Sequence, residues 1–239
     1  MIVNRLSSVF AGLFLLTAGC DSKPATVPPP HPPGNGSTQA PATGEDGSGE
    51  PGITGGQQAL EVYEALEAKI DAESDSKADR KQAYAKVADL DDGSADYAFA
   101  RAALAGRLAQ ARGLKAGKLV TEAESFARRV LEAEPDYGEG AVIRLLGSLY
   151  VNAPARLVKH GDSETGLEML EKEVEAHPDR VESRLRLGEA YVALNDPEPG
   201  FPHLCVCIKN RATFAGDNQR LLARLVDEVG GEEALGCAG

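Results

Sequence analysis

The chain is short of several features, and each shortage removes a class of function. Its 25 lysines and arginines are outnumbered by 37 aspartates and glutamates, which gives a formal net charge of −12. A nucleic-acid-binding chain offers an excess of cations to the phosphate backbone, so we expect no nucleic-acid partner. No Gly-x-Ser-x-Gly motif and no pair of carboxylates at a useful spacing stands out. We therefore expect no catalytic residues and no enzymatic activity.

Strand patterns are lacking too. From about Gln58 onward no alternation of apolar and polar residues occurs, and Asp92-Gly93, the nearest candidate for a hairpin turn, lies between two helical patterns. Good helix formers dominate, and apolar residues recur at helical spacing. The sequence predicts an all-α fold, with helices at 58–71, 76–90, 95–112, 118–134, 137–152, 162–177, 180–194, 199–210 and 216–230.

Helix starts are predicted where an acceptor side chain stands three residues before a carboxylate. Four such pairs occur: Ser76 and Asp79, Thr121 and Glu124, Asp136 and Glu139, and Asp179 and Glu182. The links between the predicted helices are short, so neighbouring helices should run antiparallel.

The first uncharged run is too short to cross a membrane. Leu6 to Gly19 follows Arg5 and holds 14 uncharged residues, whereas a bilayer core needs roughly 20 at helical rise. Such a run fits the apolar region of an export signal. It closes with Leu16-Thr17-Ala18-Gly19-Cys20, which resembles the lipobox of bacterial lipoproteins.

This resemblance implies a signal peptide at 1–19 and lipid attachment at Cys20. In that family the chain is cut before the cysteine, whose sulfur takes a diacylglycerol and whose amine takes a further acyl chain. Several acyl chains anchor a protein stably. The implied location is the bacterial cell envelope, with the domain facing the periplasm. The sequence leaves open whether the inner or the outer membrane holds it, and whether the segment is instead an ordinary secretory signal.

A linker follows the cysteine. Residues 21–57 contain eight prolines and eight glycines, and Val27 and Ile53 are their only large apolar side chains. A segment with so little to bury cannot offset the entropy lost on ordering. We therefore divide the chain into a signal peptide at 1–19, a lipid-anchored disordered linker at 20–57 and a helical domain at 58–239.

Parts of the helical domain repeat. Leu146-Gly147-x-x-Tyr150 recurs as Leu187-Gly188-x-x-Tyr191. In the helices before Pro135 and Pro178, a small residue stands twelve positions ahead of each proline, namely Ala123 and Gly166. The pattern resembles tetratricopeptide repeats, in which small residues let two helices approach closely and proline ends the second helix. It implies an α-solenoid of antiparallel helix pairs, with an insertion around Asn152 to Gly161.

A second resemblance is weaker. The lipoprotein signal, the divergent repeats and a Leu-Gly-x-Leu-Tyr helix that runs into Ala153-Pro154 look like the T component of tripartite ATP-independent periplasmic (TRAP) transporters. Members of that family are lipid-anchored and are thought to dock a solute-binding protein. The resemblance implies such a partner for this chain, whereas the tetratricopeptide pattern implies only some periplasmic or envelope protein.

The repeat pattern also implies a binding groove. In tetratricopeptide arrays the first helix of each pair lines the concave face, where ligands lie. The groove-binding residues expected on that face are Arg107, Gln110, Arg144, Ser148, Asn152 and Glu189. Their donors would suit a carboxylate of a peptide or small acid. The alternative is that they are ordinary solvated side chains. The insertion, with Pro154, Arg156, Lys159 and His160, is a second candidate contact.

One cluster of cysteines stays ambiguous. Cys205 and Cys207 follow His203 at alternate positions, and Cys237 stands near the end of the chain. Three hypotheses are open: Cys207 packs as a small apolar residue, Cys205 pairs with Cys237 in a disulfide, or the three cysteines form a metal or redox site. We expect no metal and no cofactor.

A phosphate-binding loop is also rejected. The segment from Gly113 to Lys118 resembles one, but it is one residue short and follows a helix. The favoured hypothesis is a non-enzymatic, lipid-anchored scaffold for a partner protein or peptide. The alternatives are a TRAP-like transport accessory and a metal or redox protein built on Cys205, Cys207 and Cys237.

Overall fold

The structure is a computed structural model that describes residues 53–237, with only the backbone of Leu114 described. The chain divides into two compact units, and all the described residues belong to one of them. The predicted signal peptide, the lipidation site at Cys20 and most of the predicted linker lie outside the described residues.

Residues 53–237 form helices and contain no strand, as predicted. The α-helices of this part are α1 (Gly55–Asp71), α2 (Lys77–Lys86), α3 (Ala95–Gln110), α4 (Gly117–Ala133), α5 (Tyr137–Asn152), α6 (Ser163–Ala176), α7 (Val181–Ala193), α8 (Phe201–Lys209), α9 (Gly216–Glu228) and α10 (Glu232–Leu235). Short 3₁₀ turns lie at Gly113–Lys115, Ala155–Leu157, Glu198–Gly200 and Arg211–Thr213. All nine predicted helices are present, and the short α10 was not predicted.

The first helix begins earlier than predicted. α1 starts at Gly55, inside the segment assigned to the linker. The cause is a capping box, which the content of proline and glycine does not reveal. The amide of Gln57 donates to Thr54 Oγ1 at 3.2 Å, and the amide of Thr54 donates to Gln57 Oε1 at 3.1 Å. These two bonds satisfy amides that would otherwise face only water at the helix start.

Two of the four predicted start signals stand at the start of a helix, and one of these two makes the predicted capping bonds. Ser76 and Asp79 form a capping box at α2. Asp136 directly precedes α5, as predicted, but its side chain makes no capping bond. Thr121 instead lies inside α4, where its hydroxyl is within hydrogen-bond distance of the carbonyls of Gly117 and Leu157, and α7 is preceded by Arg180 rather than capped by Asp179. Side-chain spacing alone does not decide which residue leaves the helical conformation.

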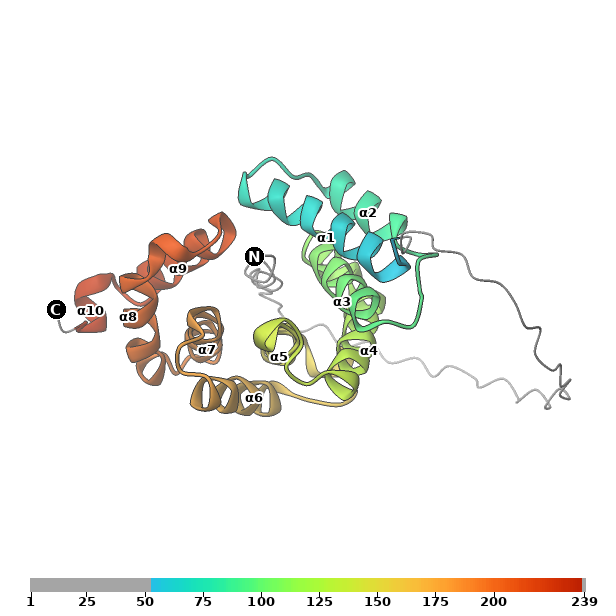
Figure 1. Cartoon of the computed structure of the whole chain (residues 1–239). Coiled ribbons are helices and arrows are strands. Elements are labelled where there is room, and N and C mark those ends of the chain that lie inside the picture. Colours follow the sequence, from blue (N-terminus) through green and yellow to red (C-terminus); the bar gives the residue numbers. More distant parts are fainter. Residues whose placement is uncertain (1–52, 238–239) are drawn as a thin grey trace, which may run out of the picture. The chain divides into compact units, whose positions relative to one another are not determined.

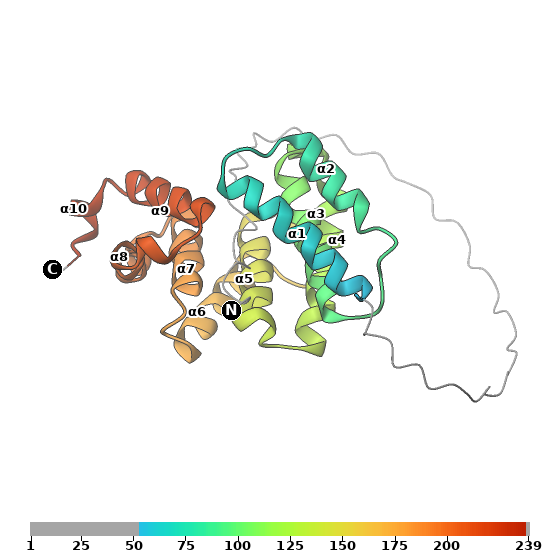
Figure 2. The ribbon, with the colours of Figure 1, turned by 45° about the horizontal axis from the view of Figure 1, so that its top comes forward.

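Successive helices pack as neighbours: α3 with α4, α5 with α6, and α7 with α8 (Figure 1). α1 lies along α3, with α2 beside both (Figure 2). α3 is buried on every side from Tyr97 to Ala109. Its many alanines allow this, because a small side chain lets neighbouring helices approach from several directions.

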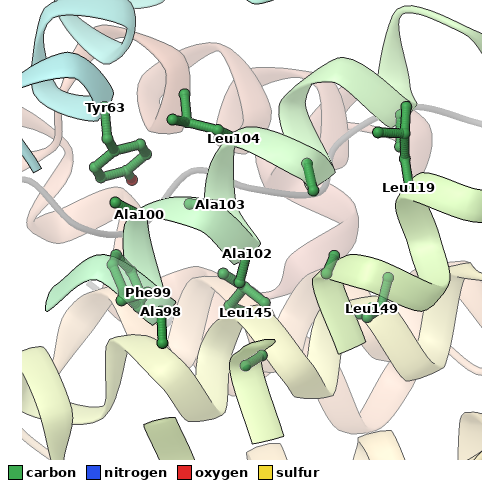
Figure 3. Close-up of a cluster of buried hydrophobic side chains, with 14 of the residues drawn as sticks. Tyr63, Ala98, Phe99, Ala100, Ala102, Ala103, Leu104, Leu119, Leu145 and Leu149 are labelled. Carbon is green, nitrogen blue, oxygen red and sulfur yellow. The ribbon is translucent and has the colours of Figure 1, made fainter. Parts of the chain in front are cut away.

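The buried apolar side chains form three clusters rather than one. The largest joins α1 to α5; there Tyr63 and Phe99 meet edge to face with ring centroids 5.8 Å apart, and Leu145 and Leu149 approach from α5 (Figure 3). A second cluster lies between α6 and α7, and a third joins α7 to the C-terminal helices. Each cluster is formed by elements that follow closely in the chain.

Two helix contacts are close enough to require glycine. A Cβ on Gly166 would lie 2.6 Å from the carbonyl oxygen of Gly147, in the contact between α6 and α5. A Cβ on Gly188 would lie 2.7 Å from Leu204 Cδ2, in the contact between α7 and α8. A side chain at Gly166 would force the helices apart because it would meet backbone atoms, whereas a side chain at Gly188 would require the buried Leu204 to shift.

The first and last long helices also touch. Arg220 of α9 donates to the carbonyls of Ile70 and Asp71, at 2.7 and 3.0 Å, at the end of α1. The amide of Asp217 donates to Asp71 Oδ1 at 3.0 Å. An arginine can donate to the unpaired carbonyls at the C-terminus of one helix, here α1. A carboxylate can accept from the free amides at the N-terminus of another helix, here α9. These bonds join residues almost 150 positions apart.

Candidate functional site

The six residues predicted to line a groove lie on three helices. Arg107 and Gln110 belong to α3, Arg144, Ser148 and Asn152 to α5, and Glu189 to α7. Arg107, Arg144, Ser148 and Glu189 are buried, with side chains or whole residues at most 7% exposed, and Gln110 and Asn152 are half-buried. They are therefore not ordinary solvated side chains.

Arg107 is held by two carboxylates from other helices. Its Nε and Nη2 donate to the two oxygens of Glu67 in α1, at 2.7 and 2.6 Å. Nη2 also lies 3.1 Å from Asp217 Oδ2 in α9. Burial opposes the charge of Arg107, but the two carboxylates outweigh it and raise its pKa above the usual value. This network ties α1, α3 and α9 together.

Arg144 is held by backbone carbonyls. Its Nη1 donates to the carbonyl of Glu139 at 2.6 Å and to the hydroxyl of Ser183 at 3.1 Å. Gly138, Glu139 and Gly140 all have positive φ, and this left-handed turn at the start of α5 lies within reach of the arginine. Burial lowers the pKa of Arg144 to about 10, which still leaves it a cation at neutral pH.

Glu189 belongs to a third buried group. Arg186 of α7 donates to Glu189 Oε2 at 2.7 Å and to Asn218 Oδ1 of α9 at 2.9 Å. Burial raises the pKa of Glu189, although the charge of Arg186 opposes the shift. Buried polar groups thus join α1, α3 and α9, α5 and α7, and α7 and α9.

The other three residues differ in their bonding. Gln110 accepts a hydrogen bond from Arg80 of α2 at 3.2 Å, and Asn152 donates to the carbonyl of Ser148 at 2.9 Å. The buried hydroxyl of Ser148 makes no hydrogen bond within the described part of the chain. Most of the predicted groove residues therefore bind helices of this chain to one another, and their contact with a ligand stays a prediction.

The structure also contains a groove that the sequence analysis missed. It has a volume of about 530 Å³ and lies between α1 and α2. Its lining is apolar at Val62, Ala65, Leu66, Ala83 and Leu90 and polar at Gln58, Glu61, Lys69, Asp79, Gln82 and Lys86. None of the residues of α2 is buried. The strongly polar sequence of α2 signals a helix that covers little of the core, but the groove itself depends on how α1 and α2 pack.

The predicted insertion is an ordered loop held by a buried carboxylate. Glu124 of α4 is 1% exposed, and its oxygens accept hydrogen bonds from the amides of Lys159 and His160 at 2.8–3.0 Å. The side chains of Arg156, Lys159 and His160 are exposed, and Pro154 is half-buried. The loop thus presents cations from a fixed backbone.

The cysteines are divided between two roles. A disulfide joins Cys205 to Cys237, and Cys207 is a buried free thiol. Burial raises the pKa of Cys207 to about 12, so the group behaves as a small apolar side chain. The disulfide occupies two of the three sulfurs that a metal or redox site on these cysteines would need. No group of three metal-ligating side chains occurs among residues 53–237.

No helix within residues 53–237 has both the length and the apolar character needed to cross a bilayer. No protein-family model matches the sequence, and no curated protein matches it.

Proposed function

We propose that this chain is a non-enzymatic scaffold of the bacterial cell envelope. A lipid on Cys20 would anchor it, and its helical domain would face the periplasm as a tetratricopeptide-like α-solenoid that binds a partner protein or peptide. The proposal leaves the choice between inner and outer membrane open.

The observation that carries the proposal is the repetition of one helix contact. Gly147 of α5 packs against Gly166 of α6, and Gly188 of α7 packs against Leu204 of α8 and against Gly200, which directly precedes α8. The same sequence pattern therefore makes the same kind of close crossing in two successive helix pairs. Repetition of one packing unit is the defining property of solenoid proteins.

The distribution of the core supports the same interpretation. Its three clusters each join helices that are near in sequence. In a repeat array each unit buries its apolar face against the next unit, so such a series of clusters is expected. Solenoids present extended surfaces to other proteins, which agrees with a scaffold role.

The predicted binding face supplies the test site. We expect the partner to reach this face at the end of α5, where Asn152 is half-buried, because most of the other predicted groove residues are buried. A photoreactive amino acid at Asn152 should form a cross-link to one envelope protein on illumination of living cells. The matched control carries the same group at Lys172, on α6, where the side chain is 70% exposed.

The outcomes separate the hypotheses. A cross-linked product from Asn152 and none from Lys172 would support a docking face on the first helices of the pairs. A solute-binding protein in that product would favour the transport accessory. Equal products from both positions, or none from a folded variant, would contradict the proposal.

A further inference from the structure

Two connections of this acidic chain are rich in cations. The connection from α3 to α4, residues 111–116, contains Arg112 and Lys115 and no acidic residue, and Lys118 follows in the first turn of α4. The connection from α5 to α6, residues 153–162, contains Arg156 and Lys159 and one acidic residue, Asp162, whose side chain caps α6. Since the whole chain has a net charge of −12, such a concentration of positive charge is unexpected. We call these five cations the basic end.

The start of α4, which follows the first connection, lies against the second connection. Thr121 of α4 donates its hydroxyl to the carbonyl of Leu157 at 3.1 Å. A Cβ on Gly117 would come within 3.2 Å of Leu157 Cδ2. All five cations of the basic end are exposed, and within the described residues none of them forms a side-chain ion pair. Their charges therefore add in one region of the surface.

The fold holds this region in place. The carboxylate of Glu124, 1% exposed, accepts hydrogen bonds from the amides of Lys159 and His160. Burying a carboxylate is costly unless its hydrogen bonds are satisfied, and here the loop backbone satisfies them. The cations of the second loop are thus displayed from a fixed backbone, which lowers the entropy lost when a partner binds.

Helix stability does not explain Lys118. α1, α2, α3 and α6 each begin with a side-chain cap. α4 begins at Gly117, after the N-cap residue Ala116, with no side-chain cap, no acidic residue in its first turn, and Lys118 in that turn. A cation near a helix N-terminus opposes the helix dipole, by about 0.3–1 kcal/mol. Residues that break a local stability rule are often retained for function.

Three other connections have the opposite charge. Residues 72–76, 87–94 and 194–200 each contain at least two acidic residues and no lysine or arginine. The connection from α8 to α9, residues 210–215, contains Arg211 and no acidic residue, but Arg211 pairs with Glu232, whereas the cations of the basic end have no such partner among the described residues.

We propose that the basic end docks an acidic segment of the partner protein. This inference rests on the proposed scaffold function and adds the chemistry of the partner. A protein segment suits the basic end because its cations have no ion-pair partner among the described residues and the second loop is displayed from a fixed backbone, so complementary carboxylates can pair with them. An anionic membrane surface is the competing partner, since the lipid proposed on Cys20 would supply the inserted apolar group, and the vesicle experiment below separates the two.

The probe is an unstructured glutamate-rich peptide, added to the isotope-labelled chain and followed by NMR. We expect amide shifts that saturate and are confined to residues 112–118 and 156–160, with binding that weakens as salt is added. Lys115→Glu/Lys159→Glu should weaken binding at least about tenfold, because attraction becomes repulsion at both loops. The control, Lys77→Glu/Lys81→Glu, makes the same charge change on exposed positions of α2 and should stay within about twofold.

Each outcome decides the matter. Equal weakening by both double variants would overturn the proposal, because net charge alone would then explain binding. Binding to vesicles of phosphatidylglycerol and phosphatidylcholine, without binding of the peptide, would overturn it in favour of a membrane contact. An inert peptide together with a cross-link at Asn152 would refute the basic end and leave the scaffold function standing. Peptide binding without any cross-link would support the basic end and contradict the scaffold function.

Discussion

Arg107 is a buried cation, and its two carboxylate partners offset the free-energy cost of burying its charge. Taking a charge out of water is costly, and the bidentate bond to Glu67 and the contact with Asp217 offset this cost. Exposed pairs such as Lys172 and Glu168, 70% and 60% exposed, contribute little, since water already solvates both ions. The two kinds of ion pair should therefore respond very differently to substitution.

Arg107→Met should lower the free energy of unfolding by about 3–5 kcal/mol, because Glu67 is left buried without a counter-ion. Lys172→Met, the control, should change it by no more than about 1 kcal/mol. Urea denaturation of both variants measures the difference. A loss of similar size in the two variants would mean that the Arg107 network does not hold α1, α3 and α9 together.

Asp92 should make the chain sensitive to acid. Hydrogen bonds from the Ser94 hydroxyl, the Gly56 amide at 2.8 Å and the Ser94 amide lower its pKa to about 2. A carboxyl whose pKa falls on folding stabilises the folded state above its unfolded pKa, and this contribution disappears as the pH drops through the folded pKa. Stability should therefore decrease between about pH 4 and pH 2.

The variant Asp92→Asn tests this prediction. It should be less stable than the natural chain at pH 7 and should lose less stability between pH 4 and pH 2, as followed by urea denaturation at each pH. If the two chains lose the same amount over that range, other carboxyls govern the acid response.

At the scale of the helix, close packing depends on glycines at the crossings. The crossing between α5 and α6 brings Gly166 against backbone atoms of Gly147 and Val151, which cannot move aside as a side chain can. The crossing between α7 and α8 brings Gly188 against Leu204, which is fully buried. Both positions should reject any larger residue.

Gly188→Trp should abolish the cooperative melting transition of the helical domain. Gly166→Ala should lower the free energy of unfolding by about 1–3 kcal/mol, although alanine is the better helix former. Gly117→Ala is the control, since its Cβ would meet only the end of Leu157 at 3.2 Å, and it should change stability by less than about 1 kcal/mol. Thermal melting followed by circular dichroism measures all three. An unchanged melting temperature in the tryptophan variant would refute the repeat alignment.

The disulfide links the segment that follows α10 to α8. α10 is only four residues long, and Cys237 follows it, joined to Cys205 on α8 across 32 positions. Reduction should lower the free energy of unfolding by about 2–4 kcal/mol, because the unfolded chain regains the freedom of that loop. Urea denaturation with and without reductant measures the loss. In the variant Cys205→Ser/Cys237→Ser, the reductant should cause no further loss of stability. A remaining loss would mean that reduction destabilises the chain through a different disulfide.

At the scale of the whole chain, the proposals concern charge and covalent attachment. Within the described residues α9 contacts α1, and the basic end contrasts with a net charge of −12 for the chain. The proposed attachment to a membrane depends on Cys20, which lies outside the described residues. The scaffold proposal requires that this cysteine hold the chain to a membrane.

Cys20→Ala should release the chain from the membrane fraction of cells that express it. The prediction follows from the resemblance to bacterial lipoproteins, because no acyl chain can then be attached to the sulfur. Cell fractionation and immunoblotting measure the distribution, with Cys207→Ala as the control that keeps Cys20. Equal membrane recovery of both variants would exclude lipid on Cys20 as the anchor.

Much of the helical architecture was predictable because it is local. The spacing of Leu60, Tyr63 and Leu66 already determines one apolar face of α1. The caps were predictable only in part: Thr121 has the residue type of a cap, yet it lies inside α4. A cap depends on backbone angles, which the identity of one side chain does not determine.

The interactions of the candidate residues could not be predicted from the sequence. Arg107, Arg144 and Glu189 were assigned to one groove, which stays a prediction, and their partners Glu67, Ser183 and Arg186 were not foreseen. Likewise, the sequence left the three cysteines with several interpretations, and the proximity of α8 and the C-terminus brings Cys205 to Cys237. Pairings between distant residues depend on how the helices cross.

By itself, the sequence determined which segments are helical, because periodicity and helix propensity act over a few neighbouring residues. Only the tertiary structure decided that α9 meets α1, that Arg107 has two carboxylate partners, and that the start of α4 lies against the connection from α5 to α6. These features join residues far apart in the chain, and their positions follow from the sum of many packing contacts that no short stretch of sequence contains.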